Sequence, residues 1–148
     1  MRRYSVTCNA IAVTTAKDVL RVSAPSSMVL VVLRAWITQS GSVTSEMNRA
    51  LLQRASDAQS GTSETPEKIE VGDPAATFTA QSLTADHTLV GDPVVDEGFN
   101  LVSGFLWVPA PEERIWIPPS GRLVLRLGVA PSASKTVSAG LIVGEVGR

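Results

Sequence analysis

Residues 105–129 read FLWVPAPEERIWIPPSGRLVLRLGV and give the clearest indication of the fold class. Proline- and glycine-rich turns separate its three apolar segments, 105–108, 114–117 and 122–129. In the last segment every second residue is a large aliphatic one, at Leu123, Leu125, Leu127 and Val129. A period of two is typical of a strand with one buried face. Short strands with turn signals between them predict an antiparallel β-sandwich or jelly roll.

The same pattern extends to both ends of the chain, where further strands are expected at 4–13, 18–23, 28–38 and 137–146. The alternation in 4–13 slips at Ala10, which predicts a β-bulge. The segment 28–38 is apolar on both faces, which is typical of a central strand. In an unbroken strand, one face of it would carry Val29, Val31, Leu33, Ala35 and Ile37.

Other segments are less regular. Residues 46–56 fit helical spacing slightly better than strand spacing, and 75–83 is a short ordered piece of uncertain type. Residues 89–99 are interrupted by Gly91-Asp92-Pro93 and by Gly98. Residues 57–74 contain almost no large apolar side chain, so we expect a long exposed polar loop there. The 148 residues are then one domain, 1–148.

The composition argues against several classes of protein. The formal net charge of -1 gives no field that attracts nucleic acid or an anionic membrane. The longest strongly apolar run is only 28–33, too short for a signal peptide core or a membrane span, so we expect a soluble protein. One Cys and one His rule out a disulfide framework and a Cys/His zinc cluster within the chain. We expect no metal and no cofactor.

Catalytic patterns are also weak. His87 lies in a polar stretch and is expected to be a solvated loop residue, while Cys8 is expected to be a small core residue. The acidic pairs Asp96-Glu97 and Glu112-Glu113 are neighbours in sequence, so the two carboxylates of a pair point to opposite faces of an extended chain. No phosphate-binding glycine loop is present. The sequence predicts a protein that is not an enzyme.

For binding, the tryptophans and nearby arginines stand out because Trp and Arg are enriched at the energetic centres of interfaces. The alternative is that the tryptophans are core residues and the arginines solvated ones. With only three lysines in the chain, we favour an interface with another subunit. The candidate interface residues are Arg34, Trp36, Trp107, Arg114, Trp116, Arg122 and Arg126.

Several segments together resemble small proteins encoded among the structural genes of tailed bacteriophages. The resemblance is carried by 4–13 (YSVTCNAIAV), 46–54, 73–80 (DPAATFTA), Asn100, 111–114 (PEER) and 119–127 (PSGRLVLRL). It spans nearly the whole chain and is most specific at 111–114 and at the PSGR turn. Such proteins are similar to capsid decoration, or cement, proteins.

The resemblance implies a small β-sandwich or jelly-roll unit that forms a homotrimer. It implies a place on the capsid surface of a virion, after synthesis in the host cytoplasm, with the major capsid protein as partner. There the protein would hold neighbouring capsomers together without catalysis. The resemblance also implies that 46–54 is extended, so we expect a strand there in spite of the local helical spacing.

Three alternatives stay open. A trimeric receptor-binding or tail-tip module would use the same sandwich and expose aromatic residues to a sugar or a surface protein. A connector or head-completion protein would form rings of higher order. An enzyme such as a lyase or hydrolase would need His87 or the acidic pairs to converge in one pocket.

Overall fold

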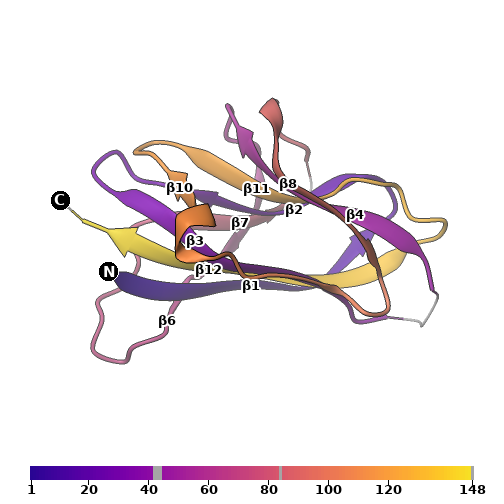
Figure 1. Cartoon of the computed structure of the whole chain (residues 1–148), viewed down its shortest axis with the longest axis horizontal. Coiled ribbons are helices and arrows are strands. Elements are labelled where there is room, and N and C mark those ends of the chain that lie inside the picture. The colour runs from indigo at the N-terminus through magenta and orange to yellow at the C-terminus, as the bar shows by residue number, and fades with distance from the viewer. Residues whose placement is uncertain (42–44, 84, 148) are drawn as a thin grey trace.

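The computed structural model of the chain describes residues 1–41, 45–83 and 85–147. They form two layers of antiparallel strands, a β-sandwich (Figure 1). The strands are β1 (Arg2–Val13), β2 (Lys17–Ser23), β3 (Val29–Gln39), β4 (Met47–Ala55), β5 (Gly61–Glu64), β6 (Glu67–Lys68), β7 (Thr79–Leu83), β8 (Leu89–Asn100), β9 (Phe105–Trp107), β10 (Ile115–Ile117), β11 (Arg122–Leu127) and β12 (Lys135–Val146). A single 3₁₀ turn, η1 (Pro111–Glu113), is the one helical element in the described residues. No helix in that part of the chain has the length and apolar character to cross a bilayer.

Sheet A has the order β10-β3-β12-β1-β6, and β9 pairs with β3 on the same edge as β10. Sheet B has the order β5-β7-β2-β11-β4-β8. The chain passes from β8 to β9 through a tight turn in which the amides of Ser103 and Gly104 donate to the carbonyl of Asn100. The edges of the two sheets at β8 and β9 therefore lie next to each other on one side of the sandwich.

The core fills the space between the sheets. Leu123, Leu125 and Leu127 of β11 all point inward and are at most 1% exposed, as the alternation predicted. The ring of Tyr4 meets Phe78 edge to face, with centroids 5.7 Å apart. Each buried leucine contributes roughly 1.5–3 kcal/mol to the free energy of unfolding. Val129, which was expected to continue this strand, lies beyond its end and is exposed.

Register shifts occur in both sheets, and two of them are bulges in sheet A. The predicted irregularity in β1 is confirmed, because its pairing with β12 shifts between Cys8 and Ile11 and Ala10 has a φ of 55°. A second shift, in the pairing of β3 with β12, leaves Leu33 as an extra residue between Val32 and Arg34. Its effect is to reverse which alternate residues face the core.

The core-facing residues of β3 therefore change phase along the strand. Leu30 and Val32 face the core before the bulge, and Ala35 and Ile37 face it afterwards. A strand that is apolar on both faces carries no signal for such a change of phase. The central position of β3 is confirmed, because it pairs with β12 on one side and with β9 and β10 on the other.

The ambiguous segments are now assigned. The strand expected at 46–54 is confirmed as β4, in which Ala50 and Leu52 reach the core. The region 57–74 is polar and largely exposed, but it also contains β5 and β6, which the sequence did not predict. The interruption expected at Gly91-Asp92-Pro93 appears as a register shift in β8, where Gly91–Val94 bulge out opposite Gln53. The interruption expected at Gly98 is wrong, because Gly98 pairs with Arg49 in regular register.

Candidate functional site

Charged side chains gather on the outer face of sheet B, in a group we call the Asp18 cluster: Asp18, Arg21, Asp86, His87 and Arg126. Leu20 and Val22 of β2 point inward, so Arg21 points outward. Residues 85–88 cross this face just before β8 and cover it. As a result the side chains of Asp18 and His87 are fully buried.

The carboxylate of Asp18 holds the cluster together. Its Oδ2 accepts a hydrogen bond from the backbone amide of His87 at 2.6 Å and lies 3.2 Å from the Nδ1 of the same residue. Its Oδ1 accepts from Nη1 of Arg126 at 3.0 Å. The amide of Asp18 donates in turn to Oδ1 of Asp86 at 3.0 Å.

The imidazole of His87 has both nitrogens engaged. Nη1 of Arg21 lies 3.1 Å from Nε2, and because a guanidinium only donates, Nε2 must accept. The proton then sits on Nδ1, which donates to Asp18. Burial, more than the neighbouring Arg122, lowers the pKa of the Arg21 guanidinium from its ordinary value.

The expectation that His87 is a solvated loop residue is wrong. The local sequence is polar, but the partners of His87 lie on strands 66 and 69 residues away, and pairing with them compensates its burial. Asp-His pairing resembles part of a catalytic triad, yet the third position is taken by Arg21, which cannot be a nucleophile.

Cys8 lies on β1 of sheet A and points into the core, where its thiol contacts the carbonyl oxygen of Val19 on the inner side of sheet B at 4.0 Å. Burial raises the pKa of this thiol to about 11, so it is a core residue, as expected. The thiol and the imidazole are on opposite faces of sheet B. In the described residues no three His, Cys, Asp or Glu side chains are arranged to hold a metal ion.

A neighbouring set of contacts fixes a second segment to the same face. The carboxylate of Asp57 accepts from the amide and hydroxyl of Thr88, both at 3.0 Å, and from Nε2 of Gln59 at 2.8 Å. These hydrogen bonds lower the pKa of Asp57. Arg21 also donates to the carbonyl of Gln59 at 3.0 Å. The Asp18 cluster therefore works as a structural clasp that holds residues 57–59 and 85–88 on sheet B.

The candidate interface residues divide between the two sheets. Arg122 and Arg126 lie on β11 in sheet B, where Arg122 donates to the carbonyl of Ser56 at 3.2 Å and Arg126 belongs to the Asp18 cluster. Four others lie on β3, β9 and β10 in sheet A: Arg34, Trp36, Trp107 and Trp116. Arg114 lies between η1 and β10. Of the seven predicted residues, three lie on one outer surface of sheet A: Arg34, Trp36 and Trp116.

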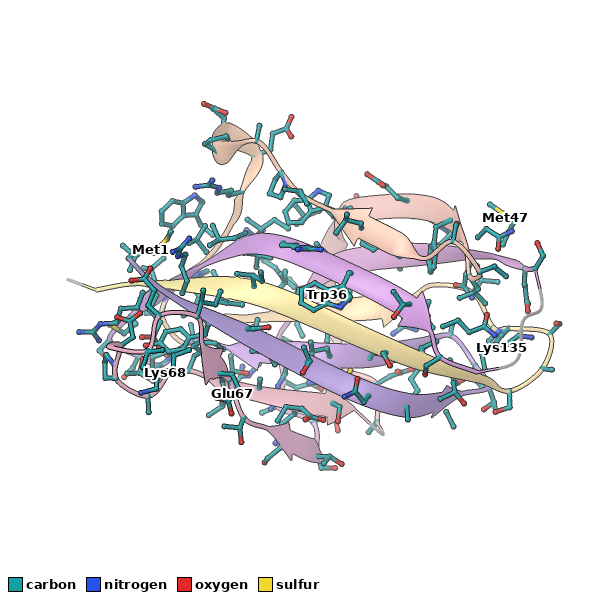
Figure 2. All side chains as sticks on the ribbon, turned by 90° about the horizontal axis from the view of Figure 1, so that it is seen from below. Met1, Trp36, Met47, Glu67, Lys68 and Lys135 are labelled. Atoms are coloured by element: carbon teal, nitrogen blue, oxygen red, sulfur yellow. The ribbon has the colours of Figure 1, made fainter. Side chains whose placement is uncertain are left out.

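Trp36 lies flat on the outer face of sheet A, across β12 (Figure 2). A Cβ at Gly140 would sit 2.0 Å from an atom of the Trp36 ring, so the ring covers the glycine backbone directly. The guanidinium carbon of Arg34 lies 5.3 Å from the ring centroid, within the range of a cation–π contact. A glycine at position 140 is what allows the indole to lie against the sheet.

Two more large side chains continue this surface. Leu106 of β9 pairs with Trp36 and is 57% exposed, and Trp116 of β10 pairs with Val31 and is 52% exposed. Both point away from the core because their neighbours Phe105, Ile115 and Ile117 point into it. We call Arg34, Trp36, Leu106 and Trp116 the aromatic face. Of these, Leu106 was missed as an interface residue, although its alternation with Phe105 and Trp107 was visible in the sequence.

Trp107 has a different place. It points inward, packs partly against the core and lines a groove of about 370 Å³ between the edges of the two sheets. Val94, Val95, Asp96, Glu97 and Glu113 complete the lining. Three of the four residues in the sequence-adjacent acidic pairs line this groove: Asp96 and Glu97 from the first pair and Glu113 from the second. Asp96 is engaged by Arg49.

Comparison of the chain with protein-family models, with curated proteins and with solved structures finds no match.

Proposed function

We propose that the protein is a non-enzymatic structural protein of a tailed-phage virion, which binds the outer surface of the assembled capsid and stabilises the shell by bridging capsomers. The observation that carries a binding role is the aromatic face. Two tryptophans, a leucine and an arginine occupy one outer sheet surface, and two of the four are more than half exposed. Exposed apolar groups gathered in this way are typical of protein interaction sites.

The capsid as partner is supported by the resemblance to decoration proteins. The buried Asp18 and His87 side chains are engaged with each other and with arginines inside the Asp18 cluster, and Asp57 is engaged by Thr88. A rigid antiparallel sandwich then serves as a scaffold that positions surfaces. Protein bound at many points of a lattice stabilises the assembled shell by mass action, because it binds the assembled state and not the dispersed one.

We further propose a jelly-roll-like homotrimer, in which part of the aromatic face packs between protomers around a three-fold axis. The arrangement leaves the segment around β6 free to reach across a capsomer boundary. Figure 1 shows that segment projecting beyond sheet A. Two contacts stiffen this segment. Arg3 forms an ion pair with Glu70 at 2.6 Å, and Lys68 Nζ donates to the Asp73 carbonyl at 2.9 Å. Val71 at its tip is 92% exposed.

A trimeric receptor-binding or tail-tip module is the second candidate. Trp36 favours it, because an indole lying flat on a sheet beside an arginine can stack on the apolar face of a sugar. A connector or head-completion role has no comparable observation in its favour.

The proposal is tested by co-sedimentation with expanded shells of the major capsid protein encoded beside it. Wild type is compared with Trp116→Ala on the aromatic face and with Met47→Ala, a control that is 63% exposed at the start of β4. We expect the Trp116 variant to bind shells at least tenfold more weakly, since an interface tryptophan contributes about 2 kcal/mol or more, and the Met47 variant to bind normally. Glycan binding without shell binding would replace the proposal with the second candidate.

A further inference from the structure

The free edge of β8 offers a docking place for another strand. β8 pairs with β4 on one side, and no described strand pairs with its other side. The bulge at Gly91–Val94 and Pro93 within it disrupt the first half of this edge. From Val95 to Asn100 the pairing with β4 is regular, which leaves six residues of unpaired edge, about 20 Å long.

Side-chain alternation determines what a docked strand would meet. Val95 and Phe99 turn toward the core, so Glu97 between them turns toward the space between the sheets. That space is the groove of about 370 Å³, which Val95, Trp107 and Glu113 also line. Phe99 and Phe105, with ring centroids 5.8 Å apart, contact each other across the two sheet edges.

The groove has an uncompensated negative charge. Asp96 is paired with Arg49 in a bidentate contact. Glu97 and Glu113 are exposed, and neither has an ion pair or a hydrogen bond to any side chain in the described residues. A lysine or arginine entering here would place its aliphatic stem on Trp107 and its charge between two carboxylates.

We propose that this groove binds an extended basic segment by strand addition along Val95–Asn100, with a lysine or arginine opposite Glu97 and apolar side chains two residues to either side. Backbone hydrogen bonds to the free edge supply affinity, and the alternate side chains supply specificity. An inward-facing charge on an edge strand discourages purely apolar strands, so Glu97 selects basic segments and rejects others. The inference rests on the proposed function only in assigning this segment to the major capsid protein.

The direct test uses a seven-residue probe, Ser-Val-Thr-Lys-Thr-Val-Ser, capped at both ends. Binding is followed by the fluorescence of Trp107 in a Trp36→Phe, Trp116→Phe background, where it is the remaining tryptophan. We expect saturable binding with a change in Trp107 emission. A probe with Glu in place of Lys should bind at least twentyfold more weakly, and a probe with N-methylated backbone amides should not bind, because it cannot pair with the edge.

Variants of the protein locate the site. The double variant Glu97→Gln, Glu113→Gln should bind the lysine probe at least tenfold more weakly than the wild type. Glu67→Gln on β6 removes an equally exposed carboxylate elsewhere and should leave binding unchanged. Equal binding by both variants would show nonspecific charge attraction and overturn the inference, as would no binding of the probe by the wild type.

Shell binding separates this inference from the proposed function. If wild type binds shells and the Glu97, Glu113 double variant binds them equally well, the docking inference fails for the capsid partner while the proposed function stands. If wild type fails to bind shells but binds the lysine probe, the proposed function fails and the groove keeps its assignment to a basic segment of another protein.

Discussion

Asp18→Ala tests whether the Asp18 cluster is a structural clasp. The substitution removes a fully buried carboxylate that accepts from Arg126 at 3.0 Å and from the His87 amide at 2.6 Å. Breaking a buried charged pair by removing one partner costs about 3–5 kcal/mol. Because the Arg126 side chain keeps 17% of its surface exposed, water recovers part of its solvation. We therefore expect Asp18→Ala to lower the free energy of unfolding by about 3 kcal/mol, near the lower end of that range.

For a domain of this size that loss corresponds to a fall in melting temperature of about 10 °C. The control is Asp96→Ala, which breaks the ion pair with Arg49 on the surface, where the side chains are 32% and 52% exposed. Exposed pairs contribute at most about 1 kcal/mol, so this variant should melt within a few degrees of the wild type. Both are measured by chemical denaturation and thermal circular dichroism. Equal stability of the two variants would refute the clasp.

Three further predictions concern single positions. Because the Cys8 thiol has its pKa raised from 9.0 to about 11, it stays protonated in the folded protein while the unfolded chain ionises. The free energy of unfolding should therefore fall by about 3 kcal/mol in total, most of it as the pH rises from 9 to 11. Cys8→Ala should remove this contribution from the denaturation curves and leave the slope of Tyr4, whose pKa burial also raises. Hydrogen bonds lower the pKa of Asp57 below 3.8, so its carboxylate should stabilise the fold above pH 3.8 and lose this contribution as the pH falls through the lowered pKa. Asp57→Asn should therefore reduce the fall in the free energy of unfolding at acidic pH; an unchanged fall would show that Asp57 is not held by these hydrogen bonds. Gly140→Ala should lift the Trp36 ring from β12 and cost about 1–3 kcal/mol, with a red shift of emission in a Trp107→Phe, Trp116→Phe background; an unshifted spectrum would show that the ring does not depend on the glycine.

The strands were predictable where one face is apolar and the other polar. β11 and β12 and the bulge at Ala10 could be identified by alternation alone. The bulge at Leu33 could not, because both faces of β3 are apolar and a change of phase leaves no trace in the pattern. The strand at 46–54 was assigned through the resemblance and against its local spacing, since what decides it is pairing with β8 and β11.

The buried site was hidden for a related reason. His87 lies in a locally polar stretch, and its partners Asp18 and Arg21 are more than 60 residues away. A signal did exist, because Asp18, Arg21 and Arg126 are charged residues within otherwise apolar strands, and such residues need buried partners when the strand is internal. The groove at β8 could not be predicted either, because it forms where the edges of the two sheets lie next to each other, and no local sequence pattern shows which strands are at the edges.

The proposed binding and stabilisation of an assembled shell is tested by titrating the protein into expanded shells, with the shell melting temperature followed by calorimetry. We expect saturation at a fixed ratio of protein to capsid subunits and a shell melting temperature that rises with occupancy until saturation. Absence of saturable binding, or saturation with an unchanged shell melting temperature, would contradict it.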